Sequence, residues 1–272
     1  MNDLSILYYQ LFLKKYMNYK LTMIINKLKI NIMLALIAIN IILLKNKQEI
    51  INNNNKKNKI LFINTKSSNS GLFSSKDYWE NRYAKGGNSG VGSYNILAKF
   101  KAEIINNFIK QNNINTVIEW GSGDCNQLSL INYKHYIGYD VSKTAIDICK
   151  KKFFNDSTKA FIHLNDNITN HNRAELSISL DVIYHLVEDN VFNIYMKNLF
   201  DSSNRYVCIY SSNFNKHTDN HVKHRKFTSW INKYLSINWK LKEYIPNKYP
   251  FVSKKNKYSS TANFYFYEKI NL

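Results

Sequence analysis

Apolar and polar residues alternate along the chain in blocks whose period changes between helix and strand. Residues 94–111 place apolar side chains at positions 96, 97, 100, 104, 105 and 108, which is the spacing of a helix with one buried face. Short apolar runs follow at 115–119 and 135–140, and a second amphipathic segment covers 143–154. This order of helix and strand predicts an α/β fold with a parallel sheet.

The alternation continues to the C-terminus. Ser142 suits the N-cap of the helix over 143–154, in which Ile146 and Ile148 would face inward. Three further strands and a closing antiparallel pair are predicted at 160–165, 176–182, 205–212, 239–245 and 262–270. The remaining helices are expected over 124–132, over 191–200, and in a segment with Phe227, Trp230, Ile231 and Tyr234 on its packing face.

The first predicted strand ends in Glu119, and a glycine turn, Gly121 to Gly123, follows at once. Asp140 ends the second predicted strand. Glycines let the backbone pass close to a ligand, and a carboxylate at the second strand end suits a ribose diol. A dinucleotide site needs a third glycine where this chain has Asn126. Glu119 would repel a pyrophosphate, but it would attract the cationic amino end of a sulfonium-bearing amino acid.

The pattern Glu119-x-Gly121-x-Gly123 with Asp140 resembles the first two motifs of class I S-adenosylmethionine-dependent methyltransferases, and the resemblance covers residues 76–272. It implies a Rossmann-like sheet of seven strands in the order 3-2-1-4-5-7-6, the last strand antiparallel, with helices on both faces. It also implies S-adenosyl-L-methionine as cofactor. The implied reaction is direct displacement, in which a substrate nucleophile attacks the sulfonium methyl in line.

The resemblance also implies roles for single residues. Glu119 would serve the turn and the methionine amino end, Asp140 the ribose hydroxyls, and Asp166 with Asn167 the adenine. The full set of expected cofactor-binding residues is Glu119, Gly121, Ser122, Gly123, Asp140, Val141, Asp166, Asn167 and Asp181. Asp166 and Asn167 are equally suited to a simple turn.

Residues after the fourth strand would face the transferred methyl, because ligands bind beyond the carboxyl ends of strands in open α/β sheets. The expected substrate-side residues are Tyr184, His185, His221, His224 and Arg225. His185 is the candidate catalytic residue, either as a general base or as a pocket-lining side chain. The His and Arg cluster would orient an acidic or phenolic substrate, or it is an exposed basic helix start.

His217, His221 and His224 have the spacing that would align them on one helix face. A zinc site with Asp219 would need such an alignment, but the segment has no cysteine and no His-Glu-x-x-His core, so no metal is expected. Upstream, Tyr78 and Trp79 with Arg82, Tyr83 and the following glycines resemble the lid of small class I methyltransferases. The alternative is a short helix whose aromatics pack on the sheet.

Residues 1–75 read as an N-terminal extension, and residues 76–272 as the methyltransferase domain. Within the apolar segment 21–44, the uncharged part covers 15 residues and would span roughly 22 Å, less than a hydrocarbon core of about 30 Å. Three readings stay open: a membrane anchor, a helix lying on a surface, and an extension without a folded role. The Asn/Lys-rich residues 45–75 would be a disordered linker. The expected location is the cytoplasm, or a membrane with the catalytic domain in the cytoplasm.

Composition changes this picture only in part. The formal net charge is +19, but Lys and Asn are abundant everywhere, so charge alone is a weak sign of nucleic-acid binding. Cys125, Cys149 and Cys208 have no metal-like spacing and read as reduced, buried thiols. Amino-directed nucleobase methyltransferases carry an Asp/Asn/Ser-Pro-Pro-aromatic motif directly after the fourth strand. This chain has no proline at residues 180–184, which disfavours methylation of an exocyclic base amine. A small-molecule acceptor is expected; the alternatives are an RNA-modifying methyltransferase and an inactive, membrane-tethered interaction protein.

Overall fold

The computed structural model describes residues 73–164, 172–253, 256 and 258–270, together with residues 15, 17, 20, 23 and 33. The chain divides into two units, Met1–Ser70 and Gly71–Leu272, and the helices and strands given below lie in the second. Most of the apolar segment 21–44 and all of the predicted linker up to residue 72 lie outside the described residues. Among the residues that are described, none belongs to a helix long and apolar enough to cross a membrane.

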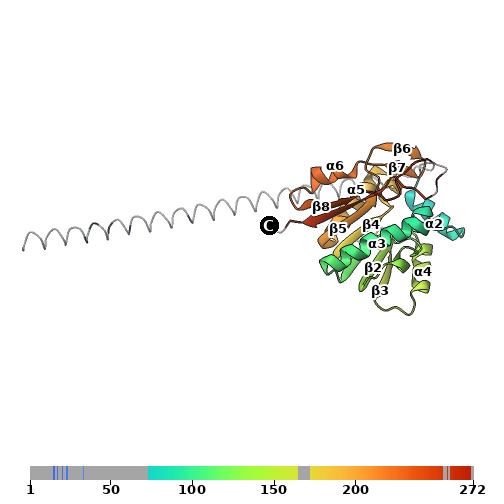
Figure 1. Cartoon of the computed structure of the whole chain (residues 1–272), viewed down its shortest axis with the longest axis horizontal. Helices are drawn as coiled ribbons and strands as arrows, with labels where there is room; N and C mark the ends of the chain where they lie inside the picture. Colours follow the sequence, from blue (N-terminus) through green and yellow to red (C-terminus); the bar gives the residue numbers. More distant parts are fainter. Residues whose placement is uncertain are drawn as a thin grey trace, which may run out of the picture. The chain divides into compact units, whose positions relative to one another are not determined.

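A seven-stranded sheet with the order β3-β2-β1-β4-β5-β9-β8 forms the centre of the second unit (Figure 1). The strands are β1 Thr116–Trp120, β2 His135–Asp140, β3 Lys159–His163, β4 Ala174–Leu180, β5 Ser203–Ser211, β8 Trp239–Ile245 and β9 Asn263–Lys269. β1 to β5 pair in parallel, whereas β9 runs antiparallel to both of its neighbours. Since β8 and β9 are the sixth and seventh strands expected from the sequence, the predicted order is confirmed.

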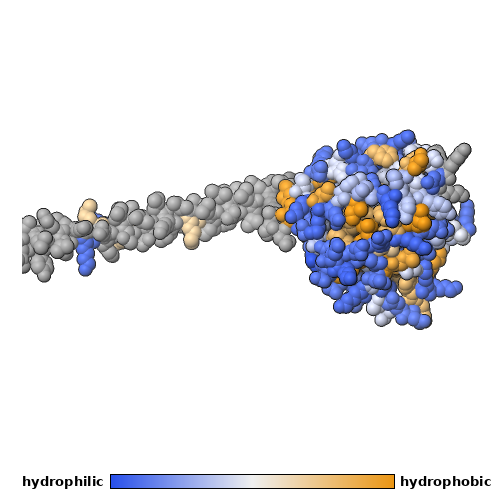
Figure 2. Space-filling view, viewed as in Figure 1, coloured by the Kyte–Doolittle hydropathy of each residue, from blue (hydrophilic) through white to orange (hydrophobic). Residues whose placement is uncertain are grey.

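Helices cover both faces of this sheet. They are α2 Ser75–Ala84, α3 Asn95–Asn112, α4 Lys143–Lys152, α5 Asp189–Asp201 and α6 Phe227–Tyr234. Successive side chains of a strand point to opposite faces. In β1, Val117 packs in the same cluster as residues of α3 and α4, while Ile118 packs with residues of α5 and α6. On the face shown in Figure 2 the unit is mainly hydrophilic, with apolar patches between polar areas.

The local predictions hold for some elements and fail for others. Ser142 caps α4, because its hydroxyl accepts from the amide of Ala145. Ile148 of α4 and Tyr234 of α6 were expected on packing faces, but they are 37% and 57% exposed, so both predictions are wrong. Ile148 is two positions after the buried Ile146, so the two side chains point to different faces of α4, and Tyr234 is the last residue of α6. In place of the helix expected over 124–132, only a 3-10 turn, η2 Leu128–Leu130, forms.

The histidine-rich segment is a β-hairpin and not a helix. β6 Lys216–Asp219 pairs antiparallel with β7 Val222–His224, so His217, His221 and His224 do not share a helix face. The four residues of β6 are all exposed and offer no apolar stripe that a helix could bury. Asn220, in the tight turn between the strands, is a residue type that turns favour. No group of three metal-ligating side chains occurs among the described residues.

Two of the three cysteines are joined. Cys125, after the glycine turn, forms a disulfide with Cys149 of α4, their Cα atoms 5.5 Å apart. The expectation of reduced thiols is therefore wrong for this pair, and it is confirmed for Cys208, which is free and buried. The pair is separated by 24 positions along the chain, and only the packing of α4 behind the glycine turn brings the two sulfurs together.

Candidate functional site

The glycine turn after β1 adopts a backbone that other residues avoid. Gly121 and Gly123 have φ angles of 85° and 55°, in the left-handed region. A Cβ on Gly121 would lie 2.5 Å from the side chain of Val182, which follows β4. The turn therefore lies tightly between the ends of β1 and β4, and a side chain at position 121 would collide with Val182.

Asp140 is placed directly on this turn. Its Oδ2 accepts from the amide of Gly123 at 2.8 Å, and its Oδ1 accepts from the amide of Ser142 at 2.8 Å. Asp140 is 7% exposed, and burial raises the pKa of its carboxyl group, although these amides and His163 oppose the rise. Val141 lies between Asp140 and Ser142 in the chain, and its carbonyl oxygen accepts a hydrogen bond from the ring of His163 at 3.1 Å. The structure thus brings Asp140 and the turn together; Asp166 and Asn167 lie outside the described residues.

Glu119 is almost completely buried, at 3% exposure, at the end of β1. Its carboxylate accepts from the hydroxyl of Tyr136 at 2.7 Å. Burial raises the pKa of Glu119 to about 7; the Tyr136 bond and the nearby Lys101 ammonium counteract part of this rise, and Asp140 adds to it. The side chain is consequently divided between its charged and neutral forms near neutral pH.

Asp181 follows β4 in an unusual backbone conformation, with a φ angle of 61°. Its Oδ1 accepts from the hydroxyl of Tyr184 at 2.8 Å, and its Oδ2 accepts from the Nζ of Lys101 at 2.6 Å. Lys101 was not among the residues expected at the site. The sequence did contain a sign that Lys101 is buried. It lies on the apolar stripe of the helix predicted over 94–111, four residues after Leu97.

The predicted lid lies against this region. α2 carries Glu80, whose carboxylate accepts from the hydroxyl of Ser142 at 2.7 Å and from the hydroxyl of Thr144 at 2.6 Å, at the start of α4. In the glycine-rich loop, the amide of Ser89 donates to Asp124 at 2.9 Å. A Cβ on Gly123 would collide with the Ser89 hydroxyl. α2 and its loop therefore lie directly on the turn, and Glu80 and Asp124, which the sequence did not single out, hold them there. This position agrees both with the predicted lid and with its alternative, a helix that packs on the sheet.

Aromatic rings join the lid to two of the predicted substrate-side histidines. Tyr78 stacks on His221 with 4.6 Å between ring centroids, and Trp79 meets His185 edge-on at 4.9 Å. The Nδ1 of His185 donates to the carbonyl oxygen of His221 at 3.0 Å, because a carbonyl can only accept. Burial lowers the pKa of His185 to about 4, so the ring is neutral at physiological pH.

The other two substrate-side candidates have separate partners. His224 shares a hydrogen bond of 2.6 Å with the hydroxyl of Ser212, and burial lowers the pKa of its ring. Arg225 donates to the carbonyl oxygens of Leu186 and Val187 and to the carboxylate of Asp189. The guanidinium of Arg225 thus fastens the segment that follows His185 and leads into α5.

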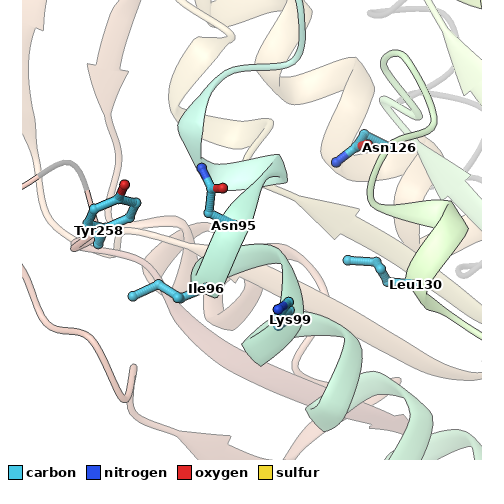
Figure 3. Close-up of a pocket in the computed structure, with 6 residues that line it drawn as sticks. All are labelled: Asn95, Ile96, Lys99, Asn126, Leu130 and Tyr258. Atoms are coloured by element: carbon cyan, nitrogen blue, oxygen red, sulfur yellow. The ribbon is translucent and has the colours of Figure 1, made fainter.

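One cavity in the described part of the chain lies away from these residues. It has a volume of about 410 Å³ and is located at the start of α3 (Figure 3). Its lining residues are Asn95, Ile96, Lys99, Asn126, Leu130 and Tyr258. None of the expected site residues lines it.

Among known proteins, solved structures share the fold of this chain. No protein-family model and no curated protein matches the sequence. The N-methyltransferase NodS from Bradyrhizobium japonicum WM9, in complex with S-adenosyl-L-homocysteine, has 11% identity and a TM-score of 0.55 over 73% of this chain and 100% of that chain. Magnesium protoporphyrin IX methyltransferase from Synechocystis PCC 6803, with bound S-adenosylmethionine, has 10% identity and a TM-score of 0.53 over 74% and 100%.

A third solved structure, an S-adenosylmethionine-dependent methyltransferase from Clostridium acetobutylicum ATCC 824, has 10% identity and a TM-score of 0.50 over 69% of this chain and 98% of that chain. Identities this low speak for the fold alone. Together with the strand order and the glycine turn, they show that the second unit of this chain has the class I S-adenosylmethionine-dependent methyltransferase fold.

Proposed function

We propose that the protein is an S-adenosylmethionine-dependent methyltransferase whose acceptor is a small molecule. The observation that carries the proposal is the contact of Asp140 with the amide of Gly123. It places a buried carboxylate beside a backbone turn that contains two glycines, at the carboxyl ends of β1 and β2, which is where an α/β sheet binds a nucleoside. The neighbours with bound S-adenosylmethionine or S-adenosylhomocysteine support the same ligand.

The charge of the region favours a cationic ligand. Among the described residues the buried carboxylates are Glu119, Asp124 and Asp140, whereas Lys101 is the only buried cation. An excess of buried negative charge is unfavourable unless an opposite charge compensates it. S-adenosylmethionine carries a sulfonium and an ammonium against one carboxylate, so its net positive charge would provide this compensation.

Methyl transfer by in-line displacement requires positioning and exclusion of water more than a strong base. The cofactor supplies the activated methyl group when it is bound. α2 and its loop would keep water out, since Glu80 and Asp124 hold them against the start of α4 and the glycine turn. His185, neutral and enclosed by Trp79 and His221, would form the acceptor wall.

Calorimetric titration of the full-length protein with S-adenosylmethionine tests the proposal. Asp140→Asn keeps the shape of the side chain but removes its charge, so affinity should fall about ten- to hundredfold, the effect of losing a charged hydrogen bond. Asp147→Asn is the matched control, because Asp147 is an exposed residue of α4 that pairs with Lys143. The proposal is wrong if the unmodified protein shows no saturable binding, or if both variants bind equally well.

A further inference from the structure

Lys101 is a charged side chain in an apolar position. It belongs to α3, has 0% exposure, and lies among the apolar residues of that helix, with its Nζ 5.3 Å from the centre of the Tyr210 ring. Removing an ammonium group from water costs several kcal/mol unless close partners compensate it. The partner here is Asp181, 80 positions away in sequence, at 2.6 Å. A residue that served only to fill space in α3 would not need a charge.

The ion pair fixes a carboxylate at the edge of the sheet where the site lies. With Lys101 on Oδ2 and Tyr184 on Oδ1, both oxygens of Asp181 are held. The loop of the lid lies directly on this group, since a Cβ on Gly92 would be 2.7 Å from Oδ2. The position of Asp181 is therefore determined by α3, by the turn after β4 and by the lid together.

Lys101 also acts on a second carboxylate. Burial raises the pKa of Glu119, and two influences lower it again: the hydrogen bond from Tyr136 and the charge of Lys101. One buried ammonium thus serves two acids, one at the end of β1 and one at the end of β4. These are the strand ends between which the glycine turn lies.

We propose that Lys101 is a positioning residue for the methyl-transfer site: its ammonium fixes Asp181 beneath the lid, at the edge of the sheet where the sulfonium ligand would bind. This inference rests on the proposed function. It assigns to α3 a part in cofactor affinity without contact between Lys101 and the reacting atoms. The ionisable groups that act on Glu119 or are acted on by it are Lys101 from α3, Tyr136 and Asp140 from β2, Tyr133 from the segment before β2, Tyr195 from α5 and Cys208 from β5.

The test is calorimetric binding of S-adenosylmethionine to the full-length protein between pH 6 and pH 8.5. In the unmodified protein, affinity should decrease as the pH falls through about 7, because Glu119 then takes up a proton. Lys101→Met keeps the length of the side chain without its charge. It should weaken binding about tenfold at pH 7 and move the midpoint of the pH dependence upward by about one unit. S-adenosylhomocysteine lacks the sulfonium charge and should lose less affinity.

Lys110→Met is the control, since Lys110 is an exposed lysine in the last turn of the same helix. If Lys101→Met does not fold, the double variant Lys101→Met/Asp181→Asn removes both buried charges and should show the same upward midpoint. Glu119→Gln should abolish the loss of affinity towards pH 6, whereas the ammonium of S-adenosylmethionine, an α-amino group with a pKa of about 8, titrates above pH 7 in every variant. A folded Lys101→Met variant that binds S-adenosylmethionine as tightly as Lys110→Met at pH 7 overturns the inference, and so does a double variant that binds as tightly as the unmodified protein. Failure of the unmodified protein to bind at any pH overturns the proposed function instead.

Discussion

The environment of His185 decides what its ring can do. The hydrogen bond from Nδ1 to the carbonyl of His221 leaves Nε2 without a proton, the form that a general base requires. Burial, however, lowers the pKa of the ring to about 4, so that its Nε2 binds a proton only weakly. A neutral ring between Trp79 and His221 is better suited to forming an acceptor wall than to removing a proton.

This environment makes a prediction about stability. The folded protein binds a proton on His185 only below about pH 4, whereas the unfolded chain does so below about pH 6.5. The unfolded state therefore binds more protons between these values, and stability decreases as the pH falls. Compared with His185→Gln, the unmodified protein should lose at most about 2 kcal/mol more free energy of unfolding between pH 7 and pH 5.

Urea unfolding of both proteins at pH 7 and pH 5 measures this difference. Glu119, whose raised pKa changes stability in the opposite direction, is present in both proteins and cancels. An equal loss in the two proteins would mean that the ring is accessible to protons in the folded state.

Residues adjacent in sequence were easier to predict than partners far apart. Glu119, the glycine turn and Asp140 are recognisable because one strand-turn-strand unit contains them all. The partnership of Lys101 with Asp181 cannot be recognised in this way, because periodicity shows which face of a helix is buried and not which residue it meets. The same holds for Glu80 and Thr144, which are 64 positions apart.

At the scale of elements, apolar periodicity predicted the strands and most helices, and the resemblance to class I methyltransferases predicted the order of the strands in the sheet. Neither predicted the short connections. The segment with three histidines forms a hairpin although its histidines have helical spacing. Its polar residues offer no apolar stripe that a helix could bury, so this spacing does not favour a helix. The lid is a helix fastened to other elements through polar groups, and its sequence reveals its aromatic residues but not the carboxylates that hold it.

The disulfide between Cys125 and Cys149 connects two such elements, the glycine turn and α4. It closes a loop of 24 positions, for which loop-closure entropy corresponds to about 3 kcal/mol of stability. The double variant Cys125→Ser/Cys149→Ser should therefore unfold at lower urea concentration than the oxidised protein. A reductant should lower the stability of the unmodified protein and leave that of the variant unchanged.

Titration of free thiols in unfolded, unreduced protein provides the control. It should detect one thiol per chain, that of Cys208. Three free thiols would contradict the disulfide, and a variant as stable as the oxidised protein would contradict its contribution.

At the scale of the whole molecule, the distribution of charge bears on the acceptor. The chain carries a formal charge of +19, with a basic isoelectric point near 9.6. Such a charge attracts any polyanion through counterion release, without selecting a sequence or serving as a substrate site. Within the described part, burial lowers the pKa of His185, which would form the acceptor wall, and of His224, so neither ring would contribute charge to RNA binding at neutral pH.

A small-molecule acceptor and an RNA acceptor therefore make different predictions in a salt titration. If the acceptor is small, single-stranded RNA should bind the full-length protein at about 50 mM salt, with equal affinity for unrelated sequences. A loss of affinity of about a thousandfold or more is expected by about 200 mM, the behaviour of purely electrostatic contacts. The affinity for S-adenosylmethionine should change much less over the same range, because buried charges are screened little. RNA affinity that differs between sequences and persists at high salt would contradict the small-molecule proposal and favour an RNA substrate.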